Sequence, residues 1–95
     1  MKVAINAGYG LFIVPRCWVE EAGLTYQEVR GDRGRTHPLV IQAIEQGEFP
    51  VKDAVIVEFP DEATDWGIFE YDGYEWVVYV LDGKMHDVYP DGGRW

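Results

Sequence analysis

The sequence has only one cysteine, Cys17, among its 95 residues. It can form no disulfide within the chain and no cysteine zinc cluster, so a reducing cytoplasm is the expected location. Histidines are also scarce, since the chain contains only His37 and His86. His86 and Asp87 are adjacent, which is a poor arrangement for a metal pair. We therefore predict neither a metal nor a cofactor.

Long apolar runs are also missing. No stretch approaches the roughly 18 apolar residues of a membrane span, and the N-terminus lacks the pattern of a secretory leader. We therefore expect no membrane association. Motifs of hydrolases, zinc proteases and P-loop proteins are absent as well, and Cys17 is expected to be a packed thiol rather than a nucleophile. These absences predict a protein that is not an enzyme.

Basic residues are few, with eight Lys or Arg against 17 Asp or Glu and a net charge of −9. Residues 1–35 carry five bases and four acids, whereas residues 36–95 carry three bases and thirteen acids. A protein that binds duplex nucleic acid needs the opposite balance, because neutralised phosphates drive that binding. We therefore exclude duplex nucleic acid as a partner. The acidic half is compatible with solubility or with mimicry of nucleic acid toward a basic protein.

Aromatic residues, by contrast, are abundant at 15% of the chain, including four tryptophans. A chain of this length predicts one domain, residues 1–95, with a modest core. Some of the rings should therefore cover a ligand or a partner subunit rather than an internal core.

Two segments have helical patterns. Residues 14–24 begin near a proline and end near a glycine, and residues 36–49 do the same. In the second segment the predicted buried stripe is Leu39, Ile41, Ala43 and Ile44. Residues 26–31 are ambiguous, with a strand as one interpretation, and residues 31–35 are expected to be a turn or loop.

The remaining apolar segments have strand patterns. They are residues 2–6, 54–59, 66–71, 74–81 and 84–89. Asp72-Gly73 and Asp82-Gly83 predict hairpin turns between the last three, because a type I′ turn needs two positive φ angles. The 74–81 strand is apolar on both faces. We expect one face to meet the helices and the other to meet another subunit, which predicts a homo-oligomer.

The predicted fold is therefore α+β: a small antiparallel or mixed sheet with two helices on one face and a C-terminal β-meander.

A Gly8-Tyr9-Gly10 tripeptide follows the first strand. It resembles the start of a phosphate-binding turn, but Ile13 stands where a third glycine would complete the dinucleotide-binding motif. A dinucleotide-binding fold is therefore not expected. Two interpretations remain: a tight turn, or a loop whose main-chain amides and Tyr9 ring contact a ligand.

Three arginines, Arg30, Arg33 and Arg35, lie within six residues just before the second helix. Guanidinium groups beside a helix N-terminus suit an anion, especially phosphate, although a solvated basic loop is an equal interpretation. His37 is expected as a cap or turn residue and is also included among the candidate ligand-binding residues.

The order of several motifs resembles a small uncharacterised family of phage and bacterial proteins with an N-terminal K-x-x-I-N-x-x-[YF]-G pattern. The matching residues here are Lys2, Ile5 and Asn6, then Gly8 to Phe12, Arg35 to Val40, Val57 to Asp61, Tyr71 to Val77, and Arg94-Trp95. Less closely, the chain is similar to phage sponges that oppose the Thoeris defence. Those proteins sequester cyclic ADP-ribose signals without cleaving them, as oligomers with pockets between subunits.

That resemblance implies a small anionic nucleotide as the ligand and the host-cell cytoplasm as the location. It implies that Arg35 and Arg94 contact phosphates and that Tyr9 and Tyr74 stack on a base. Asn6 and Asp72 would bond the ribose or the base edges. With Gly10 and His37, the candidate ligand-binding residues are Asn6, Tyr9, Gly10, Arg35, His37, Asp72, Tyr74 and Arg94.

The acidic half leaves other interpretations open. One is a protein–protein inhibitor, such as an anti-CRISPR-like nucleic-acid mimic, that binds a basic host defence protein. Its acidic surface would comprise Glu58, Asp61, Glu62, Asp65, Glu70, Asp72 and Glu75. The plainer interpretation of these acids is that most of them form only a solvated face. A further alternative is a phage accessory protein with an oligomeric role.

Overall fold

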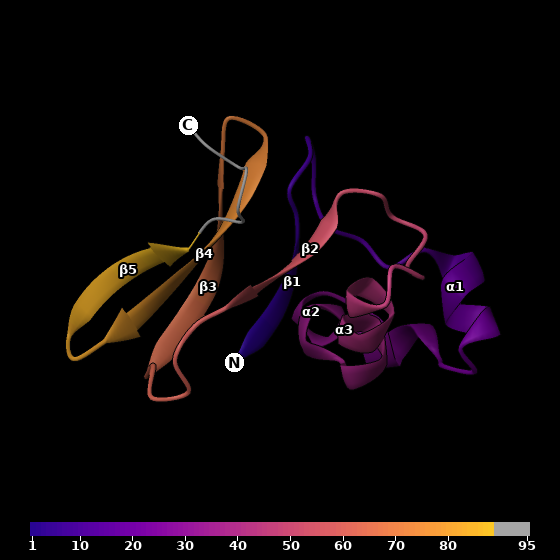
Figure 1. Ribbon diagram of the computed structural model, residues 1–95, viewed down its shortest axis with the longest axis horizontal. Coiled ribbons are helices and arrows are strands. Elements are labelled where there is room, and N and C mark those ends of the chain that lie inside the picture. The colour runs from indigo at the N-terminus through magenta and orange to yellow at the C-terminus, as the bar shows by residue number, and fades with distance from the viewer. Residues whose placement is uncertain (89–95) are drawn as a thin grey trace.

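The computed structural model describes residues 1–88 and places two antiparallel sheets beside a layer of short helices (Figure 1). The first sheet pairs β1 (Lys2–Asn6) with β2 (Ala54–Glu58). The second is a meander of β3 (Asp65–Tyr71), β4 (Tyr74–Leu81) and β5 (Lys84–Val88). The α+β fold with a C-terminal meander is thus confirmed, with its strands divided between two sheets.

Four short helices precede β2. They are α1 (Arg16–Glu21), the 3₁₀ helix η1 (Tyr26–Val29), α2 (Asp32–Thr36) and α3 (Pro38–Glu45). Helices α1 and α3 confirm the two predicted helical segments, although both are shorter than expected. His37 caps α3, because its Nδ1 accepts a hydrogen bond from the Leu39 N–H at 3.1 Å. Among residues 1–88 no helix has the length and apolar character to cross a membrane.

Two predictions for the segment between these helices were wrong. The strand considered for residues 26–31 is a 3₁₀ helix, opened by a capping box in which Thr25 and Glu28 exchange bonds with each other's backbone. The loop expected at residues 31–35 is largely α2. The capping box was a readable signal. The single turn of α2 contains Gly34, a poor helix former, so tertiary contacts must hold it.

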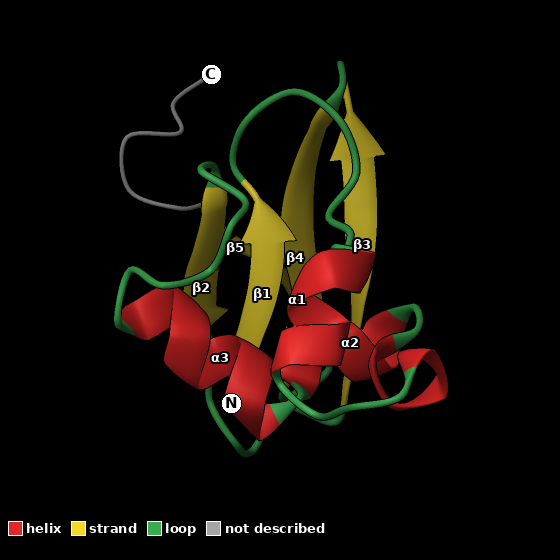
Figure 2. Ribbon diagram, turned by 90° about the vertical axis from the view of Figure 1, so that its right-hand side faces the viewer, coloured by secondary structure: helices red, strands yellow, loops and turns green. Residues whose placement is uncertain are grey.

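The β1–β2 ribbon separates two apolar cores, with the helices on one side and the meander on the other (Figure 2). Alternation along β1 explains this, because successive side chains point to opposite faces. Ala4 faces the helices, whereas Val3 and Ile5 face the meander. The helical core comprises Ala4, Phe12, Val14, Val19, Val29, Val40, Ile41, Ala43 and Phe49. The core against the meander comprises Val3, Ile5, Val57, Phe59 and Val77.

The environment of the 74–81 strand differs from the prediction. Its inner face, with fully buried Val77, packs on the β1–β2 ribbon and not on the helices. The reason is that β1 and β2 pair into a separate ribbon that fills the space expected for helices. The predicted stripe of α3 also needs a correction: Leu39 is exposed, and Val40 is fully buried in its place.

Both predicted hairpin turns are confirmed. Asp72 and Gly73 have φ angles of 54° and 83°, and Asp82 and Gly83 have 53° and 74°. These left-handed values at both central positions are those a type I′ turn requires. The β3–β4 turn has an additional constraint, since a Cβ on Gly73 would lie 2.2 Å from the Tyr9 ring.

Adjacent valines on β4 test which face belongs to the core. Replacing Val77 with alanine should lower the free energy of unfolding by about 2 kcal/mol, because it removes two buried methyl groups and leaves a cavity. Val78→Ala, on the half-buried outer face, should cost less than about 1 kcal/mol. Urea denaturation of both variants measures the difference. Equal losses would contradict the assignment of the faces.

Candidate functional site

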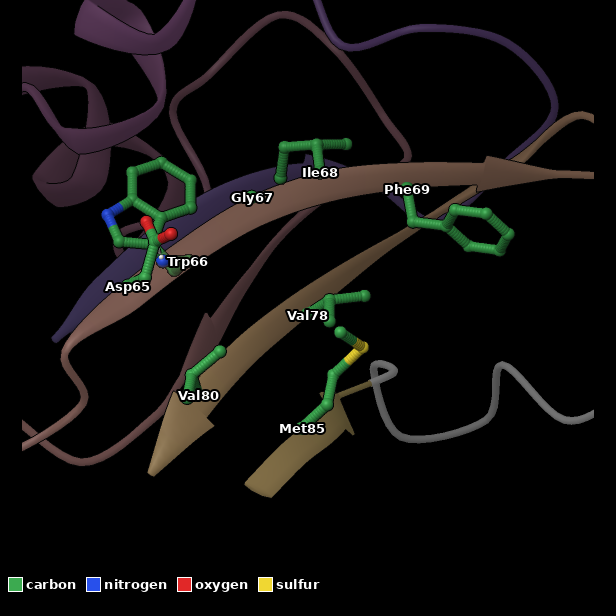
Figure 3. A pocket seen from close by; sticks show the side chains of 8 residues that line it. All are labelled: Asp65, Trp66, Gly67, Ile68, Phe69, Val78, Val80 and Met85. Atoms are coloured by element: carbon green, nitrogen blue, oxygen red, sulfur yellow. Dashed lines mark hydrogen bonds between the residues drawn. The ribbon is translucent and has the colours of Figure 1, made fainter. Parts of the chain in front are cut away.

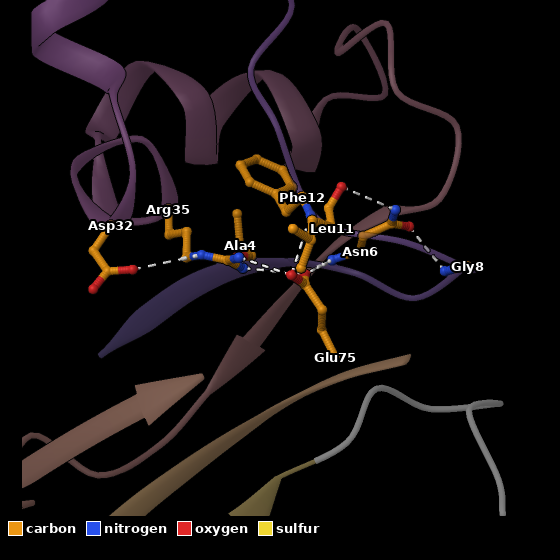
Figure 4. Close-up of polar contacts among 8 residues, drawn as sticks. All are labelled: Ala4, Asn6, Gly8, Leu11, Phe12, Asp32, Arg35 and Glu75. Atoms are coloured by element: carbon orange, nitrogen blue, oxygen red, sulfur yellow. Dashed lines mark hydrogen bonds and ion pairs between the residues drawn. The ribbon is translucent and has the colours of Figure 1, made fainter. Parts of the chain in front are cut away.

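A buried ion pair joins the helical layer to the meander. The Arg35 guanidinium donates two bonds to the Glu75 carboxylate, from Nη2 to Oε2 at 2.8 Å and from Nη1 to Oε1 at 3.2 Å (Figure 4). Glu75 has no exposed surface, and Arg35 is 8% exposed. This paired geometry is the strongest form of ion pair available to arginine.

Backbone groups complete the surroundings of both charges. The Asn6 N–H donates to Glu75 Oε1 at 2.9 Å, and the Phe12 N–H donates to Oε2 at 3.2 Å. Glu75 therefore accepts four bonds, about the number its two oxygens can take. Arg35 Nη1 also donates to the Ala4 carbonyl at 3.1 Å, and the guanidinium lies over the Phe12 ring at 5.5 Å.

The local backbone brings Arg35 to this position. A Cβ on Gly34 would lie 2.3 Å from the Val29 carbonyl oxygen and 2.9 Å from Val14, so only glycine lets α2 approach this closely. Arg35 then points from α2 across β1 to β4 (Figure 4). At 3.7 Å from Arg35 Nε, the exposed Asp32 carboxylate adds a weaker charge contact.

These contacts shift the ionisation of Glu75. Burial raises the pKa of its carboxyl, but the hydrogen bonds from Arg35, Asn6 and Phe12 and the positive charge of Arg35 lower it, and the net pKa lies below the ordinary value. The carboxylate therefore stays charged in the folded protein. Its contribution to stability is present above the ordinary pKa of about 4.3 and is lost as the pH falls through the lower, folded value.

Six of the eight predicted ligand-binding residues lie around this pair or the turn beside it. Asn6 ends β1, and its side chain accepts from the Gly8 N–H at 2.9 Å and donates to the Leu11 carbonyl at 3.5 Å. The Asn6 amide therefore shapes the loop after β1.

The Gly8-Tyr9-Gly10 loop packs on the β3–β4 turn. The Gly10 N–H donates to the Gly73 carbonyl at 2.8 Å, next to Asp72. The Tyr9 ring contacts Tyr74 edge-on, with ring centroids 5.9 Å apart, and remains 78% exposed. Gly10, with φ of 113°, has the backbone freedom that the turn interpretation requires. The tripeptide is thus a turn that docks the loop, while its contact with a ligand stays a prediction.

The other two candidates lie elsewhere. His37 caps α3 and is not part of this cluster. Arg94 lies outside the described residues. The phosphate role predicted for Arg35 also meets a physical obstacle, because its guanidinium already bonds Glu75 and Ala4. An incoming phosphate would have to displace a buried carboxylate.

Sequence analysis missed the role of Glu75, which it placed on an acidic surface although the side chain is fully buried. A signal existed. Glu75 shares the inner face of β4 with Val77 and Tyr79, and a charge on an apolar strand face needs a buried partner. The sequence contained candidates for that partner in its arginine-rich segment, but no local rule connects positions 40 residues apart.

A second candidate site lies on the outer face of the meander. A shallow hollow of about 370 Å³ forms above Gly67, lined by Phe69, Val78, Val80 and Met85 together with Asp65, Trp66 and Ile68. Figure 3 shows Met85 extending from β5 toward Val78 of β4. The hollow exists because Gly67 has no side chain opposite Val78, its partner in the register.

Within residues 1–88, no group of three or more His, Cys, Asp or Glu side chains is arranged to hold a metal ion. The chain matches no protein-family model, and no curated protein or solved structure is significantly similar to it. The resemblance to phage proteins therefore stays a prediction.

Replacing Glu75 with glutamine tests the buried pair. The variant should lose about 3–5 kcal/mol of stability at pH 7, because the Arg35 charge stays buried without its counter-charge. Wild-type protein should also lose stability as the pH falls below about 4.3, and the variant should lose less over the same pH range because it lacks the Glu75 contribution. Urea denaturation at several pH values measures both effects.

The matched control is Glu45→Gln. Glu45 pairs with Lys2 at 2.6 Å, but both side chains are over 40% exposed. The free energy of unfolding should therefore fall by about 0.5 kcal/mol or less. Equal losses in the two variants would contradict a structural role for the Arg35–Glu75 pair.

Proposed function

We propose that this protein acts by binding, without catalysis, and that its main binding surface is the outer face of the β3–β4–β5 meander. The observation that supports this best is the exposure of Phe69 and Met85, at 51% and 73%, on a sheet whose inner face already packs in a core. Contiguous exposed apolar surface on a small domain is typical of an interaction site.

The geometry of this face favours recognition over chemistry. Val78 and Val80 come from the central strand β4, which is hydrogen-bonded on both sides, so the surface is rigid. Among the residues that line the hollow, only Asp65 has a titratable side chain. One exposed carboxylate provides no nucleophile–base pair, whereas an apolar hollow beside projecting side chains suits a complementary surface.

Sequestration of a cyclic nucleotide of the cyclic ADP-ribose type is a second candidate, at a different place. The supporting observation is the exposed Tyr9 ring against Tyr74, next to Asn6 and Asp72. An aromatic pair of this kind suits stacking on a base. The phosphates would need a cation other than Arg35, whose bonds are already used by Glu75.

The outer face can be tested with Nile red, an uncharged dye that the acidic surface does not repel. The double variant Phe69→Ser/Met85→Ser should lose most of the dye fluorescence, because it removes two exposed apolar side chains that line the hollow. Its melting temperature should stay within about 4 °C of wild type, since exposed substitutions change stability by about 0.5 kcal/mol.

The matched control is Leu11→Ser/Ile13→Ser, which removes two side chains that are 62% and 66% exposed outside the meander. It should keep most of the fluorescence. If this control loses the signal and the outer-face variant does not, the binding surface lies elsewhere.

The nucleotide candidate has its own test. A cyclic ADP-ribose isomer that binds should, at about 100 times its dissociation constant, raise the free energy of unfolding by about 2.7 kcal/mol. The melting temperature should then rise by more than about 10 °C. Tyr9→Ala should abolish the shift, whereas Tyr26→Ala, another exposed tyrosine, should not. Arg35→Ala is unsuitable as a test, because it would leave Glu75 buried without its counter-charge and destabilise the whole protein. No shift with any isomer would rule out this candidate.

A further inference from the structure

We propose that the partner of the outer meander face is a basic protein surface with an apolar centre. This inference rests on the proposed function and names the chemistry of its partner. It comes from two properties of the face, its small area and the sign of the charges around it.

The apolar face is too small to hold a partner alone. The strands have seven, eight and five residues, and at a spacing of about 4.8 Å with about 3.3 Å per residue they cover roughly 320 Å². A standard interface buries about 800 Å² on each partner. A partner seated on Phe69, Val78 and Met85 must therefore also contact the rim of the sheet.

That rim is acidic. Asp65 and Asp87 lie at the register positions of Val80 and Val78, so both are on the outer face. Asp72 and Asp82 occupy the turns at the two ends of β4. Residues 61–88 contain eight acids and one lysine, but Glu75 is buried against Arg35, so the exposed charges of this segment sum to −6. The lysine, Lys84, pairs with Leu81 and shares the inner-face register of β4.

These charges discriminate between occupants. A second copy placed face to face would bring two acidic rims together, and like charges across an interface cost several kcal/mol. An anionic nucleotide would meet the same repulsion without a described arginine or lysine on that face. A basic partner instead gains attraction at the rim and apolar contact at the centre, the usual anatomy of an interface.

The experiment uses the full ¹⁵N-labelled chain and two synthetic peptides. One peptide alternates lysine with valine and tyrosine, and the other carries glutamate in place of lysine. Titration with the basic peptide should move the amide signals of Gly67, Phe69 and Val78, and the affinity should fall at least tenfold when salt rises well above the physiological level, which shortens the Debye length below about 8 Å. The acidic peptide should not bind.

Two charge variants localise the effect. Asp65→Asn/Asp87→Asn should weaken binding at least fivefold. The control is Glu20→Gln/Glu21→Gln, which removes the same two negative charges from exposed positions on α1. It should leave the affinity within twofold of wild type. Equal weakening in both variants would overturn the inference, because it would reduce the effect to net charge.

Other occupants give different results, and each would overturn the proposal. Concentration-dependent shifts of the outer-face amides without peptide would identify a second copy. Shifts of the same amides in Trp95→Ala would identify the C-terminal residues of this chain. If Phe69→Ser/Met85→Ser loses Nile red binding but neither peptide binds the wild-type protein, the binding surface is supported and the basic partner is refuted. Unchanged Nile red binding in that variant would refute the binding surface itself.

Discussion

The ion pair between Arg35 and Glu75 is the interaction on which the rest of the structure depends. It connects α2 to β4 across β1, and its backbone partners on Ala4, Asn6 and Phe12 fix the end of the first strand and the loop that follows. The two apolar cores lie on opposite faces of a two-stranded ribbon, and such a ribbon is only marginally stable by itself. A buried pair gives little net stability, but it specifies one arrangement, because a misplaced layer would leave two charges buried without partners.

Local patterns predicted most of the elements, and non-local contacts explain what they missed. The meander was predictable because Asp72-Gly73 and Asp82-Gly83 fix two hairpins over a few residues. The division of the strands into two sheets was not, since β1 and β2 are separated by some 50 residues and either could have joined the meander. Helix α2 was missed for the same reason: its single turn depends on the contact of Arg35 with β4 and not on its own propensity.

The candidate site shows a related limit. The Gly-Tyr-Gly and arginine patterns selected Tyr9, Gly10 and Arg35, and the resemblance to phage proteins added Asn6, Asp72 and Tyr74. The structure brings all six to one junction. Glycine-rich turns and grouped arginines occur both at binding sites and where separate parts of a fold meet, so the patterns alone did not distinguish the two roles. The missing information was the identity of the partner. Arginine near a helix predicts an anion, and here the anion is the chain's own Glu75.

The same pair also directs attention away from the junction and toward the opposite side of the meander. Because Glu75 and Val77 anchor the inner face of β4 to the ribbon, the alternation of the strand must place Val78 and Val80 outward. In a protein built only to be stable, those positions would be polar, as the solvated face of an antiparallel sheet usually is. Apolar side chains there, beside Asp65 and Asp87, are the reason for the proposed partner, which would supply both an apolar contact and positive charge.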